Sequence, residues 1–316
     1  GFAWFLLGNA VVSMPELIQI ADLFGVWCVS FVVAMTAGLI VDILRLPLRR
    51  NPSKPSGINR LNPGVARLAA VYVVTIMMVL AYGLFRLHEP GVHYAGLKVS
   101  TVQEYIPQSI KDSKSPEEKQ QMFQRHANLS LEAAAEKPDL IAWPETIIPE
   151  EINREWIQLD PSIKLSEVGR EYLARAREYD AQLKKLSDKI GAYLLVGAPG
   201  WDPLSNQRQN LAVLYSPGHG QVYPYYAKRH LVPFGEFIPF TGIPWLHRAL
   251  LYLTPSPDYD YSLTPGDSWL TFEVFPLHAA GAAPESARFG VPICYEDVMP
   301  YPCRSFVAPV GGRKGA

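Results

Sequence analysis

Three residues that together can perform acyl transfer lie at the ends of short apolar segments in this 316-residue chain. The first is Cys294, which follows an alternating run over residues 289–293 that has the period of a strand. A thiol at a strand end can meet substrate, and neighbouring charges can hold it as the thiolate that attacks carbonyl carbons. A lone cysteine is more often a small buried apolar residue. Cys294 is therefore a candidate nucleophile that needs partners.

Two other segments supply charged partners. Residues 139–145 are mostly apolar and end on Glu145 directly after a proline, and residues 225–236 hold Lys228 and end on Glu236. A carboxylate can take the thiol proton, and an ammonium group can stabilise an oxyanion. Taken singly, Glu145 fits an ordinary capping carboxylate, and Lys228 and Glu236 fit solvated surface charges. In this combination they predict acyl transfer through a thioester.

The residue order of these segments resembles the catalytic motifs of the carbon-nitrogen hydrolase (nitrilase) superfamily. The resemblance rests on Trp143-Pro-Glu145, on Lys228 within residues 225–236, and on Ile293-Cys-Tyr-Glu296. The run His-Leu-Val-Pro-Phe-Gly-Glu-Phe-Ile-Pro over residues 230–239 is more specific. It resembles the apolipoprotein N-acyltransferases, the membrane-bound branch of that superfamily.

The resemblance implies a role for each member of the triad. Glu145 is expected to be the base that takes the proton of Cys294, the nucleophile. Lys228 is expected to stay cationic beside Glu145 and to form the oxyanion site with a backbone N–H near Tyr295. It implies no metal and no organic cofactor.

The resemblance also implies supporting residues around the triad. Glu236 and Glu296 are expected to orient Lys228 and the substrate amine, and Asn210 resembles a family position near the active site. The aromatic residues Trp143, Tyr295 and Phe234 are candidates for the wall of an acyl path. Core packing is an equally good account of these three aromatic side chains.

The resemblance further implies the two substrates. The thiolate takes the sn-1 acyl chain of a phospholipid donor, and the α-amino group of the diacylglyceryl-cysteine of an apolipoprotein accepts it. A membrane-anchored nitrilase-type amidase and an inactive truncated membrane protein are the alternatives. The formal net charge of -1, without a basic run interleaved with aromatics, argues against a nucleic-acid partner.

Two apolar stretches predict an anchor in the membrane. Residues 23–44 and 65–86 each have about the 20 residues that cross a bilayer as a helix. The connecting loop, residues 45–64, is basic and has no Asp or Glu, which predicts a cytoplasmic position. A periplasmic catalytic domain over residues 96–316, in a multi-pass protein of the bacterial inner membrane, follows. Residues 1–22 are expected to form a periplasmic stub with an amphipathic approach to the first helix.

The remaining pattern predicts an α/β domain that follows transmembrane helices. A strand over residues 96–103, a helix over 115–135 and a strand that leads to Glu145 begin such a layer. A helix over 165–190 and strands over 193–197 and 210–215 continue it, with residues 149–160 as a surface insertion. The resemblance implies an αββα sandwich, with the C-terminal part of the domain missing and the chain truncated at both ends.

Cysteines and loop residues complete the sequence-based expectations. With only Cys28, Cys294 and Cys303, a disulfide framework is not expected to hold the chain together. Aliphatic residues that follow Trp245 are candidates for a lipid-facing lid, with ordinary packing as the alternative. They are Leu246, Leu250, Leu251 and Leu253.

Overall fold

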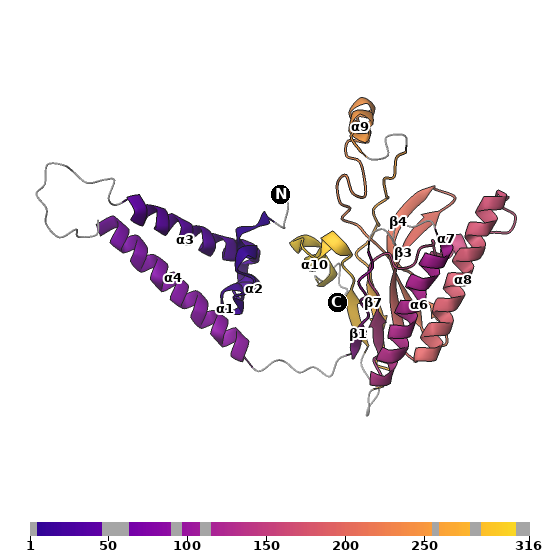
Figure 1. Cartoon of the computed structure of the whole chain (residues 1–316), viewed down its shortest axis with the longest axis horizontal. Helices are drawn as coiled ribbons and strands as arrows, with labels where there is room; N and C mark the ends of the chain where they lie inside the picture. Colours follow the sequence, from indigo (N-terminus) through magenta and orange to yellow (C-terminus); the bar gives the residue numbers. More distant parts are fainter. Residues whose placement is uncertain are drawn as a thin grey trace, which may run out of the picture. The chain divides into compact units, whose positions relative to one another are not determined.

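The chain folds into two compact units, Gly1–Tyr94 and Ala95–Ala316. The structure is a computed structural model, shown in Figure 1, and it describes residues 5–45, 63–89, 97–107, 115–254, 259–278 and 286–307. The predicted basic loop, apart from Arg45, Pro63 and Gly64, lies outside the described residues.

The first unit is built on two long apolar helices, α3 (Val26–Arg45) and α4 (Pro63–His88). Both are long and apolar enough to cross a membrane, judged by length and composition. They extend to different bounds than the predicted spans over 23–44 and 65–86. The described residues before α3 include the short helices η2 (Leu7–Val11), α1 (Pro15–Ile18) and α2 (Ala21–Phe24).

A small apolar core joins the stub to the two long helices. Ile20 of the stub is buried with Val29 and Val32 of α3 and Val79 of α4. The outward faces of the long helices stay apolar and exposed. Such surfaces are costly in water and are expected where lipid covers them.

The second unit contains a six-stranded mixed sheet. β1 (Val99–Thr101), β2 (Leu140–Ala142) and β3 (Tyr193–Asp202) are parallel neighbours. β4 (Gln207–Ser216) is antiparallel to β3, and both β5 (Gly220–Gln221) and β6 (Tyr226–Ala227) pair with β4. A separate antiparallel pair is formed by β7 (Thr271–Val274) and β8 (Ala287–Gly290).

Two helices cover one face of this sheet, as Figure 1 shows for α6 (Pro116–Ala133) and α8 (Glu167–Ile190). The hydroxyl of Ser115 accepts a hydrogen bond from the N–H of Glu118, so the predicted capping serine starts α6. Gly191 ends α8 in the left-handed region at φ 64°. The predictions of both helices are confirmed.

Alternate residues of the central strands face two different apolar layers, as a pleated strand requires. Leu194 and Val196 of β3 pack under α6 and α8, whereas Leu195 packs with Phe272 and Val274 of β7 on the opposite face. Phe306 of α10 (Pro300–Val307) joins that second layer. The predicted α/β layering, with a second sheet behind the first, is confirmed.

The segment predicted as a surface insertion, residues 149–160, is partly core. It contains the short helix α7 (Arg154–Ile157), and Ile152 and Trp156 are buried. The rings of Trp156 and Trp201 pack with their centroids 4.7 Å apart. The prediction was wrong because a tryptophan on a short helix carries no periodic signal.

The segment between β6 and β7 leaves the sheet as a long excursion and carries α9 (Pro244–Leu251). No residue of α9 is buried. Figure 1 shows α9 at the tip of this excursion. Nε2 of His247 on α9 lies 3.0 Å from the carboxylate of Asp260.

Candidate active site

Glu145 lies in a tight turn that is folded over β3. The N–H of Trp143 donates to the carbonyl of Leu195 at 2.9 Å, and the N–H of Ile147 donates to the carbonyl of Gly197 at 3.1 Å. Between these bonds Thr146 adopts φ 55°. The turn therefore holds Glu145 above the middle of a buried strand.

Lys228 follows β6 and is a buried cation. Its side chain is 1% exposed, and its N–H donates to the carbonyl of Asn210 at 2.8 Å. The ammonium nitrogen Nζ lies 2.8 Å from Oε1 of Glu236 and 3.6 Å from Oε1 of Glu145. Because an unpaired buried charge is very costly, these two carboxylates account for the presence of Lys228 in the interior.

Asn210 ties the two carboxylates together. Its amide nitrogen Nδ2 donates to Oε1 of Glu145 at 2.6 Å and lies 3.3 Å from Oε1 of Glu236. The N–H of Val232 also donates to Oε2 of Glu236 at 2.9 Å. Asn210, expected near the site from the resemblance, thus contacts the candidate base directly.

Cys294 opens a short turn, η5 (Cys294–Glu296), a few residues after β8. Its φ is 52°, a left-handed conformation that costs a residue with a side chain about 1–2 kcal/mol. Residues held in such conformations cluster at functional sites. The side chain is exposed, as a nucleophile requires.

The thiol of Cys294 lies among the charges of the site. Burial raises the pKa of Cys294, and the neighbouring carboxylate of Glu145 raises it further, whereas Lys228 and the N–H of Tyr295 lower it. The raised pKa keeps the thiol protonated at neutral pH, so attack requires that a base take the proton. Glu145, the carboxylate whose charge raises the pKa of this thiol, is the candidate base.

Glu296 differs from its predicted role. It is fully buried and accepts hydrogen bonds from the hydroxyl of Tyr226 and the N–H groups of Arg229, His230 and Ile293, each at 2.9 Å. Within the described residues, the hydrogen bonds of Glu296 do not include Lys228. Its carboxylate is fully buried, so it does not face a space that a substrate amine could occupy. Glu296 instead fastens the Cys294 turn to the segment that carries Lys228.

The aromatic candidates also divide. Trp143 is a core residue: its indole donates to Ser130 at 2.8 Å and packs edge-on against Phe123, which agrees with the core-packing account of this side chain. Tyr295 is buried, with its ring 5.6 Å from that of His230. Phe234 is 53% exposed and remains available to a ligand.

Tyr226 belongs to the site but was not predicted from the sequence. Tyr226 donates its hydroxyl to both oxygens of Glu296, and burial and that carboxylate raise the pKa of Tyr226 strongly. The two residues are 70 positions apart, so no local pattern links them. The signal lies only in the tertiary structure.

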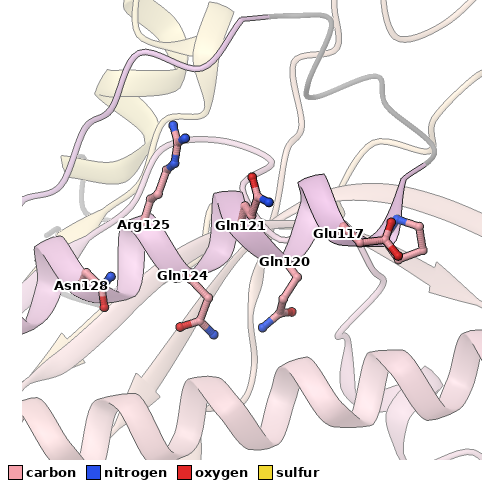
Figure 2. Close-up of a pocket in the computed structure, with 7 residues that line it drawn as sticks. Glu117, Gln120, Gln121, Gln124, Arg125 and Asn128 are labelled. Atoms are coloured by element: carbon pink, nitrogen blue, oxygen red, sulfur yellow. The ribbon is translucent and has the colours of Figure 1, made fainter.

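A hollow on the surface of α6 is separate from this site. It is lined by polar side chains that Figure 2 shows projecting from the helix: Glu117, Gln120, Gln121, Gln124, Arg125 and Asn128, beside Pro116. No member of the triad lines it. The candidate active site is therefore the cluster around Cys294.

The charges of the cluster suit thioester chemistry. Lys228 and Glu236 form a pair at 2.8 Å that is neutral as a whole, which leaves Glu145 as the carboxylate that can accept the thiol proton. The ammonium nitrogen of Lys228 lies 3.6 Å from Oε1 of Glu145. Glu145, Lys228 and Cys294 come from three separate segments, and their roles as base, cation and nucleophile stay a prediction.

Comparisons with known proteins find two family models that match this chain. The family model described as carbon-nitrogen hydrolase matches residues 98–310, and the model described as apolipoprotein N-acyltransferase N-terminal domain matches residues 1–39. An apolipoprotein N-acyltransferase of Geobacter metallireducens is 28% identical over 97% of this chain and 50% of its own length. One from Azotobacter vinelandii is 30% identical over 95% of this chain and 48% of its own length. The chain spans about half the length of these curated relatives.

Among solved structures, the NitN amidase from Neterenkonia sp. AN1 is similar with a TM-score of 0.36. Its sequence is 16% identical, and the match covers 63% of this chain and 58% of that chain.

Proposed function

Because the chain belongs to the carbon-nitrogen hydrolase family, we propose that it is the acyl-transferring part of an apolipoprotein N-acyltransferase. The observation that carries the proposal is the convergence of Glu145, Lys228 and Cys294. The curated relatives that carry this name match nearly the whole of this chain. The activity, substrates and location that follow are part of the proposal.

The first half of the cycle acylates the cysteine. Glu145 takes the proton of Cys294, and the thiolate attacks the carbonyl carbon of the sn-1 ester of a phospholipid. The oxyanion of the tetrahedral intermediate forms near the ammonium of Lys228 and the N–H of Tyr295. The C–O bond then breaks, Glu145 returns the proton to the leaving alkoxide, and a lysophospholipid departs.

The second half transfers the acyl chain to nitrogen. The neutral α-amino group of a diacylglyceryl-cysteine attacks the thioester carbon, and Glu145 accepts a proton from that nitrogen. The C–S bond breaks as the amide forms, and the proton passes to the sulfur. Cys294 is thereby restored as a thiol, with no net change in oxidation state and no co-reactant.

Lipid substrates would explain why the chain exposes large apolar surfaces. Two helices long enough to span a membrane would anchor a periplasmic catalytic domain to a bacterial inner membrane. The excursion around α9 exposes large apolar side chains, with Trp245 at 73% and Leu253 at 82%. Leu246, Leu250 and Leu251 lie on α9 between them. We propose this excursion as the lipid-facing lid.

Mass spectrometry separates this proposal from its two alternatives. The protein is incubated with phospholipid vesicles, and its mass is compared with that of a sample in which Cys294 is replaced by alanine. An added mass equal to one acyl chain, absent from the Cys294→Ala protein, supports acyl transfer. Turnover of a small amide without an adduct would indicate an amidase, and neither signal would indicate a protein without this enzymatic activity.

A further inference from the structure

Gly197 of β3 lies against the backbone of the turn that carries Glu145. An ideal Cβ on Gly197 would lie 2.6 Å from the nitrogen of Thr146, 2.7 Å from Cα of Glu145 and 2.7 Å from the carbonyl oxygen of Pro144. Non-bonded carbon atoms do not approach backbone atoms this closely. A methyl group at Gly197 must therefore push the Glu145 turn away from the strand.

Gly266 has the same relation to the segment that carries Lys228. Its N–H donates to the carbonyl of Lys228 at 2.9 Å. An ideal Cβ on Gly266 would lie 2.9 Å from the carbonyl carbon of Ala227 and closer still to its oxygen. A side chain at Gly266 therefore displaces the peptide bond that joins Ala227 to Lys228.

Backbone conformation is not the reason for glycine at these two positions. Neither Gly197 nor Gly266 has a φ in the left-handed region, in contrast to Gly191, which ends α8 at φ 64°. A left-handed φ therefore does not exclude alanine at these positions, whereas the close approach of the neighbouring backbone does. This makes glycine-to-alanine substitution a local probe of backbone distance.

We propose that Gly197 and Gly266 are positioning residues that independently set the distances of Glu145 and Lys228 from Cys294. The assignment deepens the proposed function and rests on it for its catalytic meaning. The two glycines belong to different segments and contact different backbone stretches, so each controls one partner of the thiol. A misplacement of about 1 Å can cost an enzyme about 10²-fold in rate.

The thiol of Cys294 reports on both distances. The charged groups that act on it are Glu145 and Lys228, Glu236 pairs with that lysine, and the N–H of Tyr295 is the nearby neutral donor. Alkylation of Cys294 by iodoacetamide follows its thiolate fraction, so the pH profile of the rate gives its pKa. The reaction needs no lipid, and it tests the positioning role even if the proposed function is wrong.

The experiment is a pair of double-mutant cycles in the full-length protein purified in detergent. Gly197→Ala and Gly266→Ala are each made alone, with Glu145→Gln and with Lys228→Met. Cys28 and Cys303 are replaced by alanine throughout, so that only Cys294 reacts. Gly242→Ala is the matched control, because a Cβ on Gly242 has nothing within 4 Å and its φ is not left-handed.

The proposal predicts partner-specific effects. Gly197→Ala shifts the pKa of Cys294 by about half a unit or more, and the shift persists with Lys228→Met but disappears with Glu145→Gln. Gly266→Ala shows the reverse dependence, with its shift lost only in Lys228→Met. Gly242→Ala leaves the pKa unchanged.

Two results would overturn it. A shift that is the same in every background, or absent, would mean that the glycines do not act through Glu145 and Lys228. Loss of a thermal unfolding transition in both single variants would also overturn it, because the glycines would then determine the fold and not the geometry of the site.

Discussion

Lys228 is the residue on which the electrostatics of the site depend. Its side chain is 1% exposed and lies near the carboxylates of Glu145 and Glu236. Burial of this charge has a desolvation cost that an apolar side chain in the same place would not have. A buried ion pair that served only stability could be replaced as a whole by apolar residues, whereas removal of Lys228 alone would leave its carboxylate partners unpaired. Stabilisation of an oxyanion would explain why a cation is present in the interior.

Lys228→Met is expected to abolish thioester formation. The substitution keeps much of the side-chain length and removes the charge that stabilises the tetrahedral intermediate, a change worth about 10²–10³ in rate. The acyl adduct on the protein is quantified by mass spectrometry at fixed times with phospholipid vesicles. Near-normal acylation of this variant would remove Lys228 from the mechanism.

The pH profile of Cys294 gives a second prediction for the triad. The raised pKa means that its reaction with iodoacetamide speeds up as pH rises through and above the ordinary thiol range. Since Glu145 raises this pKa and Lys228 lowers it, Glu145→Gln should shift the profile to lower pH and Lys228→Met to higher pH. Shifts of the same sign in both variants would contradict this arrangement of charges around the thiol.

The sequence singles out residues whose chemistry is unusual, but it does not show the direction in which a side chain points. Glu145, Lys228 and Cys294 end apolar segments, and their residue types together indicate one reaction. Trp143 is only two residues from Glu145, yet its indole points into the helix-covered core. Glu296 looked like a substrate ligand because a sequence does not reveal which carboxylate accepts backbone N–H groups.

At the scale of elements, the capped and periodic segments were predictable. Ser115 starts α6 and Gly191 ends α8, and both signals are local. The excursion that carries α9 was not predicted as a helix, since it has no buried residue and its form depends on long-range contacts such as His247 with Asp260. The close approach of Gly197 to the Glu145 turn is likewise visible only in the tertiary structure.

The excursion around α9 yields a prediction of its own. Replacing the exposed Trp245 and Leu253 together by serine removes large apolar side chains that make little contact with the domain. Acyl transfer from phospholipid in vesicles should fall, because less apolar surface enters the lipid. Alkylation of Cys294 should be unchanged. Full activity of the double variant on vesicles would show that the excursion has no role as a lid.

At the scale of the whole molecule, two apolar helices precede a domain with a complete candidate triad. The sequence predicts this division from its apolar stretches, and the chain separates into two compact units near residue 95. The predicted side of the membrane for the second unit rests on the charge of the loop between α3 and α4. That loop has Arg and Lys residues and no acidic residue over residues 45–64.

Reporter fusions test this orientation. An enzyme that is active only in the periplasm, fused after Glu89, should be active, and the same enzyme fused within residues 45–60 should be inactive. The reason is that short basic loops stay in the cytoplasm. The opposite pattern would place Cys294 in the cytoplasm and invert the topology.

The identity of the acylated residue tests the central claim most directly. The full-length protein is incubated with phospholipid labelled in its acyl chains, and the label that neutral hydroxylamine releases is measured in Cys28→Ala, Cys294→Ala and Cys303→Ala variants. Cys303 lies against the carbonyls of Glu296 and Asp297, and Cys28 lies in α3, so neither is placed to react. The account predicts that only Cys294→Ala loses the label. A label that persists in Cys294→Ala, or that disappears only in Cys303→Ala, would contradict it.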